Sequence, residues 1–359
     1  MHRRVAAPTV VAFALFVSVA LIAGSKDGFR FCDVIHLGRF VDPALLTPCE
    51  GGSGPGYDGQ FYFAIAHDPL LTRPQTAASL DDSLRYRRIL YPLLAWIVSA
   101  GQPIALPYVL VAINVLAATA LIWIAALAAA AAGRSPWWSL MLAAFVGVWL
   151  PVARDLTEPL QLALLAAGVT SGSAALLLFA GFAKETAGVA LVTEAARGLV
   201  RGDRRLAVRF GLAAAALALW VAFVFFFVHG TAEASLGGRF LRPVGAPLIV
   251  LGETLRGDPE RFVLTALALS VCVLAIARVY SVRDGAGLAG ALYAAVELGA
   301  GYDNWQEPLA VFRAMAGAVV LVYFSWCRAR DRLGTFAIVL AATSGIADVA
   351  LLIARARFL

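Results

Sequence analysis

Residues 104–131 read IALPYVLVAINVLAATALIWIAALAAAA, a run without a charged side chain. A helix needs about 20 predominantly apolar residues to cross the hydrocarbon core of a bilayer, and this run exceeds that length. Comparable apolar runs recur at about 5–23, 137–153, 158–171, 172–184, 187–200, 206–229, 261–280, 286–301, 308–326 and 335–354. The sequence therefore predicts an all-α polytopic membrane protein. Because several runs are short, we expect about 9–11 transmembrane helices.

The composition agrees with a chain that is dissolved in lipid. Of its 359 residues, 61% are hydrophobic and 14% are charged, whereas a soluble domain carries about 25% charged residues. The net charge of +6 does not indicate nucleic-acid binding, because the basic residues lie in short clusters between apolar runs and not along one stripe. We expect a single membrane domain over residues 1–359, surrounded by membrane lipids, with no nucleic-acid partner.

The basic clusters predict the orientation. Arg3 and Arg4 precede the first apolar run, which resembles a signal peptide but ends in a poor cleavage site. We interpret this run as a retained first helix whose N-terminus is cytoplasmic, in the inner (cytoplasmic) membrane. Alternation then places the following basic clusters inside, as the positive-inside rule requires: 133–134, 201–205, 278–283 and 328–332. The basic tail at 355–357 would lie outside, against the rule.

Two long segments are expected on the extracytoplasmic side, at residues 25–88 and 230–260. The first contains Cys32 and Cys49, which could pair in the periplasm, although spacing alone leaves the pairing open. Within the same loop, the stretch from Tyr57 to Ala66 alternates aromatic and polar residues at roughly helical spacing, which predicts an interfacial helix on the membrane surface.

Charged residues that are far apart in the sequence are predicted to meet at this outer boundary. They are Asp58, Asp68, Arg154, Asp155, Glu158, Lys184, Glu185, Arg239, Arg242, Asp303 and Glu307. Charges next to apolar runs are costly unless they pair or line a polar cavity, so this set defines where chemistry is expected.

Asp58 is the first candidate for chemistry, in the stretch Gly56-Tyr57-Asp58-Gly59-Gln60-Phe61-Tyr62. The glycine after the acid would let a ligand approach closely, because it adds no side chain. A carboxylate near the lipid boundary is partly desolvated, which raises its pKa and suits a general base for a sugar hydroxyl. The alternative is that Asp58 caps the helix that follows it, which the residues alone favour.

Lys184 and Glu185 interrupt an apolar stretch of more than twenty residues. Such charges are expected to pair or to line a cavity, and the short apolar halves on both sides predict two helices that turn at the active face. Lys184 would bind a phosphate, and Glu185 would orient it or accept a sugar hydroxyl. The alternative is an interfacial turn from which both side chains reach the headgroups.

Three further stretches are candidates with open alternatives. The segment from Arg154 to Pro159, which contains Asp155 and Glu158, is either a helix-capping loop or part of a site. Gly237-Gly238-Arg239 is compatible with a phosphate-binding loop, although glycine-rich outer loops are common. Arg313 lies inside a predicted helix, where an unexplained charge points to function. The histidines show no metal-ligand spacing, so no metal or other cofactor is predicted.

The stretch Tyr57-Asp58-Gly59-Gln60-Phe61-Tyr62, with Arg87-Arg88-Ile89-Leu90-Tyr91-Pro92 after it, resembles the GT-C superfamily of integral-membrane glycosyltransferases. It is similar in particular to bacterial proteins linked to cell-surface glycopolymer formation. Thr157-Glu158-Pro159 and Ala183-Lys184-Glu185 lie where such proteins carry an acidic motif and a basic turn. The resemblance covers roughly residues 1–200, and Lys184 departs from the usual arginine.

The resemblance implies a GT-C-like helical bundle and an inverting transfer from a polyprenyl-phosphate-linked sugar. The acceptor would be a glycan, lipid or protein of the cell envelope. Carried over, Asp58 is the general base, and Lys184, Arg88 and Arg239 bind the donor phosphate. Residues expected to support substrate binding are Tyr57, Gln60, Tyr62, Asp155, Glu158, Glu185 and Arg313.

Two functions from other classes stay open at this point. Intramembrane charges and broken helices would also serve a flippase or transporter of lipid-linked sugars. A transporter requires its charges near the midplane, whereas those of this chain are predicted at one boundary. A non-catalytic membrane scaffold in glycopolymer assembly would keep the fold without using the base.

Overall fold

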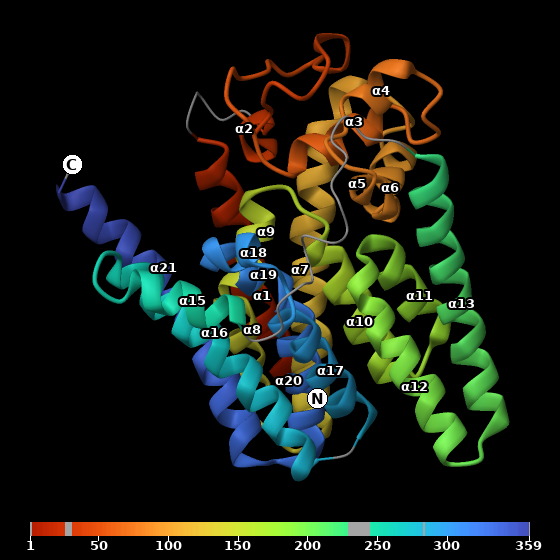
Figure 1. The fold of residues 1–359 in the computed structure, drawn as a ribbon, viewed down its shortest axis with the longest axis vertical. Helices are drawn as coiled ribbons and strands as arrows, with labels where there is room; N and C mark the ends of the chain where they lie inside the picture. Colours follow the sequence, from red (N-terminus) through yellow and green to blue (C-terminus); the bar gives the residue numbers. More distant parts are fainter. Residues whose placement is uncertain (1, 26–30, 229–244, 283, 359) are drawn as a thin grey trace.

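The computed structural model describes residues 2–25, 31–228, 245–282 and 284–358, and over these residues the protein contains helices and no strand (Figure 1). Five helices are long and apolar enough to cross a membrane. They are α1 (His2–Ala23), α7 (Leu106–Ala131), α13 (Arg204–Phe227), α16 (Pro259–Ala277) and α21 (Arg332–Phe358). A sixth crossing is possible by length if α8 (Leu140–Ala144) and α9 (Val146–Ala153), which meet at a 59° bend, act as one.

Among the described residues, fewer helices of spanning length are found than the 9–11 that we expected. The three apolar runs predicted between 158 and 200 do form separate helices, but each is shorter than a bilayer crossing requires: α10 (Glu158–Ser171), α11 (Ala174–Ala183) and α12 (Gly188–Val200). Gly172 provides the first break, with a left-handed φ of 66° that ends α10. Short apolar helices elsewhere are α17 (Gly285–Leu298) and α20 (Ala316–Ala329).

The first loop folds into a compact set of short helices at one end of the bundle, the upper end in Figure 1. They are α2 (Cys32–Ile35), η1 (Pro43–Leu45), α3 (Gly59–His67), α4 (Pro74–Ala78), α5 (Leu84–Arg87) and α6 (Leu90–Val98). The other short elements are η2 (Pro103–Ala105), η3 (Pro136–Ser139), η4 (Glu185–Ala187), α15 (Gly245–Thr254), η5 (Arg278–Tyr280), α18 (Tyr302–Gln306) and α19 (Pro308–Ala314).

Helix α3 is not an interfacial helix, so the expectation for residues 57–66 was wrong. Every residue from Gly59 to Ala66 is buried, and Phe61 and Ile65 are 3% and 0% exposed. These side chains pack in a core that α6 and α7 complete, with Tyr91 and Leu110 among its members. Burial against protein, and not contact with lipid headgroups, therefore explains the aromatic pattern of this segment.

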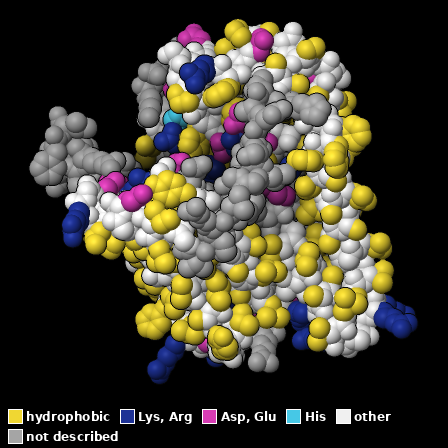
Figure 2. All heavy atoms as spheres, viewed as in Figure 1, with side chains coloured by type: hydrophobic (Ala, Val, Ile, Leu, Met, Phe, Trp, Pro, Cys, Tyr) yellow, Lys and Arg dark blue, Asp and Glu magenta, His cyan; other side chains and the backbone are white. Residues whose placement is uncertain are grey.

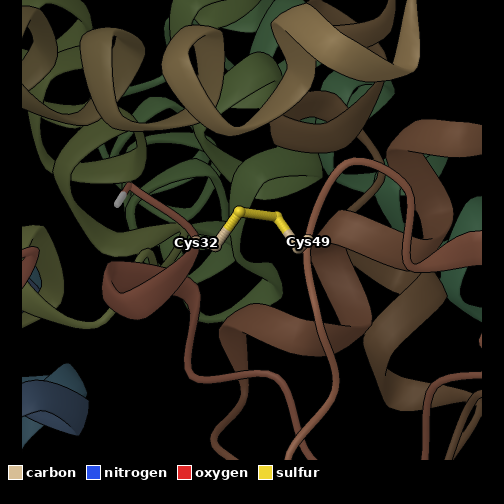
Figure 3. The surroundings of a disulfide bond; sticks show 2 residues. All are labelled: Cys32 and Cys49. Carbon is tan, nitrogen blue, oxygen red and sulfur yellow. A yellow bond between two sulfur atoms is a disulfide. The ribbon is translucent and has the colours of Figure 1, made fainter. Parts of the chain in front are cut away.

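Cys32 and Cys49 form a disulfide, which settles the pairing that spacing had left open (Figure 3). Their Cα atoms are 5.6 Å apart, and the bond ties α2 to the segment that precedes α3. The other two cysteines, Cys272 and Cys327, are buried free thiols in the helical bundle.

Basic residues mark the end of the bundle that lies opposite the first loop. Figure 1 places the N-terminus and the turns from α12 to α13, from α16 to α17 and from α20 to α21 at this lower end. Lys and Arg side chains project from the same end in Figure 2. Helix α21 starts there and runs toward the level of the first loop, so the chain ends far from its beginning.

Candidate functional site

Acidic and basic side chains gather between the first-loop helices and the bundle, near the centre of the face shown in Figure 2. We call this set the charged cluster and define it by its ion-pairing residues. They are Asp58, Arg85, Arg88, Glu158, Lys184, Glu185 and Arg313. The residues come from the start of α3, from α5 and its end, from the start of α10, from the break between α11 and η4, and from α19.

Asp58 lies at the centre of the charged cluster, between two guanidinium groups. Its Oδ2 is 2.9 Å from Nη1 of Arg85 and 2.9 Å from Nη2 of Arg313. The side chain makes no capping hydrogen bond to α3, so the capping role that we had weighed is not the one this carboxylate takes. Its position before the helix directs it toward the arginines instead.

The electrostatic premise for Asp58 as a strong base also needs correction. Burial on its own would raise the pKa of Asp58, as we expected from the sequence. The positive charges of Arg85, Arg313 and Arg88 outweigh burial and hold the pKa of this carboxyl well below its ordinary value. In this state Asp58 is a fully ionised, tightly paired carboxylate, and it is a weak base until its arginines are drawn away.

Arg313 connects Asp58 to the rest of the cluster. Its Nη1 donates to the Tyr57 hydroxyl at 3.2 Å, and burial raises the pKa of that phenol to about 12, so Tyr57 stays neutral. Its Nε lies 3.1 Å from Oε1 of Glu158. That contact lacks hydrogen-bond geometry, because Nε is buried without a hydrogen-bond partner. One guanidinium therefore lies between two carboxylates, with a hydrogen bond to Asp58 and only a charge contact to Glu158.

Glu158 and Lys184 form the most deeply buried pair of the cluster. Nζ of Lys184 donates to Oε1 of Glu158 at 2.9 Å, and the two side chains are 6% and 2% exposed. Glu158 opens α10 with Pro159 in the first turn, as predicted, but neither Glu158 nor Thr157 caps the helix through its side chain. Removing one partner would leave an uncompensated buried charge, which is strongly destabilising.

Arg88 and Glu185 form the third pair, in the two-pronged geometry typical of arginine and carboxylate. Nε and Nη2 of Arg88 lie 3.2 Å and 3.3 Å from the two oxygens of Glu185, and Nη1 donates to the Tyr62 hydroxyl at 2.9 Å. Glu185 and Lys184 stand at the break between α11 and α12, which confirms that two short helices turn at these charges.

Comparison of the chain with family models, with curated proteins and with solved structures finds no match.

Four cationic groups lie beside the carboxylates of the charged cluster. Arg85, Arg88, Arg313 and Lys184 face Asp58, Glu158 and Glu185, and Arg85 also pairs with the more exposed Asp81 at 2.9 Å. Guanidinium groups that already bind carboxylates in a two-pronged manner can bind phosphate in the same manner. An incoming phosphate would therefore exchange with the carboxylates and would not need a new set of ligands.

Asp155 belongs to a separate network of hydrogen bonds. Its Oδ1 accepts hydrogen bonds from the Tyr91 hydroxyl at 2.5 Å and from Nδ2 of Asn114 at 3.2 Å. Asp155 makes no ion pair with the cluster, so it supports α6 and α7 at this point and does not belong to the charged surface. Sequence reasoning gave no site role to Tyr91 or to Asn114, because Asn114 is one polar residue within the apolar run at 104–131 and Tyr91 precedes that run in another apolar segment.

Gln60, like Asp155, does not join the charged cluster. Gln60 binds the backbone of its own loop, since Nε2 donates to Pro55 O at 2.8 Å and Oε1 accepts from Gly38 N at 3.1 Å. Arg239 lies outside the described residues. We had expected Gly59 to let a ligand approach, but the space beside it is filled by protein backbone. A Cβ at this position would lie 2.7 Å from Arg154 O and 2.9 Å from Ile35 O.

Arg85 is the member of the charged cluster that sequence reasoning missed. Our reading of the sequence gave a role to Arg88 alone, although Arg85 and Arg88 are three residues apart and so share one face of a helix. Arg87 falls on another side, where its guanidinium lies 6.0 Å from the ring of Phe225. Among the described residues, no group of three or more acids, histidines or cysteines has the geometry of a metal site.

Proposed function

We propose that this protein is a GT-C-type glycosyltransferase that uses a polyprenyl-phosphate-linked sugar donor on the extracytoplasmic side. One observation carries the proposal: Asp58 lies between Arg85 and Arg313, with Arg88 and Lys184 in the same cluster, at the end of a helical membrane bundle. A base next to a phosphate-binding set is the arrangement that transfer from a lipid phosphate requires.

Donor binding would change the state of Asp58. The donor phosphate would take up guanidinium groups that now bind carboxylates, and Asp58 would then lose part of the charge that depresses its pKa. The same event would therefore place the donor and restore the basicity of the carboxylate. Because of this coupling, Asp58 can pair with Arg313 at 2.9 Å before the donor binds and still act as the base afterwards.

The transfer step itself balances without a further reagent. Asp58 accepts the proton of an acceptor hydroxyl as its oxygen forms a bond to the anomeric carbon of the sugar. The bond from that carbon to the phosphate oxygen breaks, and the electron pair leaves with the polyprenyl phosphate. Arg88, Arg313 and Lys184 stabilise the negative charge that grows on the leaving phosphate. Attack from the face opposite the leaving group gives inversion.

Replacement of Asp58 by Asn tests the proposal. Purified wild-type protein is offered radiolabelled polyprenyl-phosphate sugars with cell-envelope acceptors, and transfer is measured. We expect D58N to lower the transfer rate by about 10²–10⁴-fold, the usual contribution of a general base. D81N is the matched control, since Asp81 also pairs with Arg85 but does not contact Arg313, and it should change the rate only a few-fold.

Transfer by D58N at the wild-type rate would rule out Asp58 as the base. Movement of the labelled lipid across a vesicle membrane by wild-type protein, without transfer, would favour a transporter instead. Absence of both activities, with an unchanged melting temperature, would favour a scaffold.

A further inference from the structure

A cavity lies at the end of the helical bundle that is opposite the first loop. It is lined by the ends of α10 and α20, by α12, and by the starts of α11, α13 and α17. Its volume is about 180 Å³, the liquid volume of roughly six water molecules, so a phosphate group fits inside it. We call it the arginine cavity, after three of its lining residues: Arg197, Arg209 and Arg328. No residue of the charged cluster lines it.

Two of these arginines have no carboxylate partner among the described residues. Nη2 of Arg209 donates to Gly172 O at 3.0 Å, and Nη2 of Arg328 donates to Val169 O at 3.4 Å. These contacts cap the last carbonyls of α10, but they use one N–H group of each guanidinium and leave its charge without a counter-ion. Both arginines are exposed, so their other donors are within reach of a ligand.

Arg197 supplies the third positive charge, and Glu194 is the acid of the lining. Nη1 of Arg197 donates to both oxygens of Glu194, at 2.6 Å and 2.7 Å, whereas Nη2 is not used by this glutamate. The pair packs so closely on the start of α17 that a Cβ on Gly285 would clash with it. The described lining therefore has three arginines and one glutamate, an excess of positive charge that favours an anion.

The positive charge continues into a neighbouring cavity that shares Arg328. This second cavity lies between the ends of α7 and α20, reaches α10 at Thr170, and has a volume of about 590 Å³. The charged residues of its described lining are Arg328 and Arg330, and no acid is among them. Arg330 donates to Ala132 O. An anionic headgroup on Arg328 would therefore have room on this side and would meet no carboxylate there.

The helix that carries Arg209 also faces lipid. Helix α13 is long and apolar enough to cross a membrane, and Leu212, Leu219 and Phe223 are exposed on it. Leu212 lies three residues after Arg209, and Leu219 and Phe223 follow at spacings of seven and four, so an exposed apolar stripe begins beside Arg209. An acyl chain can lie on this stripe while its headgroup lies in the cavity. A free phosphate would make no use of the stripe.

We infer that the arginine cavity binds the phosphate of an anionic phospholipid from the leaflet at this end of the bundle. Arginine binds phosphate through paired N–H groups, and basic pockets between transmembrane helices suit anionic headgroups. A zwitterionic lipid carries a cation next to its phosphate, and that cation would lie among the arginines. The cavity therefore selects phosphatidylglycerol over phosphatidylcholine. The inference does not rest on the proposed function, since it involves no residue of the charged cluster.

Native mass spectrometry of the full chain in a neutral detergent tests the inference. Phosphatidylglycerol or phosphatidylcholine with the same acyl chains is added in increasing amounts, and the apparent dissociation constant of the first bound lipid is measured. We expect phosphatidylglycerol to bind about tenfold more tightly, and R209Q and R328Q should each remove most of this preference, as loss of a charge-assisted hydrogen bond predicts. R209K keeps the charge without the two-pronged geometry and should weaken binding several-fold, which covers failure of R209Q to fold.

Arg205→Gln is the matched control for charge. Arg205 is an exposed residue one turn before Arg209 on the same helix, and it does not line the cavity. Diffuse attraction of lipid to basic residues would make R205Q and R209Q equally harmful. We expect R205Q to leave the preference for phosphatidylglycerol nearly unchanged.

Glu194→Gln gives a result that loss of folding cannot imitate. It removes the acid of the cavity and frees Nη1 of Arg197, so phosphatidylglycerol should bind several-fold more tightly. Melting temperatures without added lipid show whether each variant is folded. Equal binding of the two lipids, equal losses in R205Q and R209Q, or no gain in E194Q would each overturn the inference. Displacement of phosphatidylglycerol by an equal concentration of inorganic phosphate would assign the cavity to a free anion and would overturn it as well.

Discussion

Asp155 is the carboxylate whose titration is most strongly shifted upward outside the spanning helices. It follows α9 with a left-handed φ of 53°, a conformation that Asp tolerates better than most residues. The side chain is fully buried, Oδ1 binds Tyr91 and Asn114, and Oδ2 has no hydrogen-bond partner. Burial raises the pKa of Asp155 from 3.8 to about 7, although the two hydrogen bonds oppose the rise.

This pKa predicts a pH-dependent stability that Asp155→Asn should remove. Between pH 3.8 and about 7 the folded protein keeps the Asp155 proton, whereas the unfolded chain has lost it. Stability therefore falls as the pH rises through this window, by up to about 1.4 kcal/mol per pH unit. Above the window both states are ionised and the contribution is constant. Melting curves of purified protein from pH 4 to pH 8 measure the slope.

A control variant separates titration from general loss of stability. Asp203→Asn removes a carboxylate that caps α13 through Leu206 N at an exposed site, and because Asn caps a helix about as well as Asp, it should leave the melting temperature and its pH slope nearly unchanged. D155N should instead flatten the slope, since Asn can still accept hydrogen bonds from Tyr91 and Asn114. A slope that persists unchanged in D155N would assign the titration to another group.

At the scale of elements, the start of α3 is where the fold fixes the position of Asp58. Gly59 follows Asp58 and packs against the backbone at Arg154 and Ile35, with no room for a Cβ. We expect Gly59→Ala to push α3 away and to destabilise the protein by about 1–3 kcal/mol, the usual effect of overpacking. Gly54→Ala is the control, because nothing lies within 4 Å of a Cβ there. Chemical denaturation should give a lower free energy of unfolding for Gly59→Ala than for Gly54→Ala. Equal free energies would contradict the close packing at Gly59.

The elements show which features the sequence could predict. The run at 104–131 becomes α7 (Leu106–Ala131), because an uninterrupted apolar stretch has no local reason to break. The turn at Lys184 and Glu185 was also predictable, since charges interrupt the apolar pattern there. The burial of α3 was not, because it depends on α6 and α7 closing over a segment whose own pattern fits a membrane surface equally well.

The sequence predicted most of the residues of the candidate site, but it did not predict which of them form ion pairs. Asp58, Lys184 and Glu185 were identified as charges that apolar surroundings require to be satisfied, and Arg88 entered through the resemblance alone. Their partners depend on contacts between distant segments: Arg313 binds Asp58 across 255 positions of the chain. For the same reason the lowered pKa of Asp58 could not be inferred from its loop alone.

At the scale of the whole molecule, the protein has two chemically different ends. The first-loop end carries the charged cluster and the disulfide, and the opposite end carries basic turns such as residues 201–205, all of them exposed. Helices of spanning length connect the two ends. The excess of Arg at one end is the usual mark of the cytoplasmic side, which predicts that the charged cluster faces outward.

Cysteine labelling tests this orientation with little background, because Cys32 and Cys49 are bonded and Cys272 and Cys327 are buried. Leu70→Cys lies in the first loop at a position that is 73% exposed, and Val200→Cys lies at the opposite end at one that is 89% exposed. A membrane-impermeant maleimide added to spheroplasts should label L70C at once and V200C only after the membrane is opened. The reverse order would place the charged cluster in the cytoplasm, where no periplasmic acceptor could reach it. Labelling of both sites before opening would show that the spheroplasts leak, and a fluorescent cytoplasmic marker retained in the same sample controls for this.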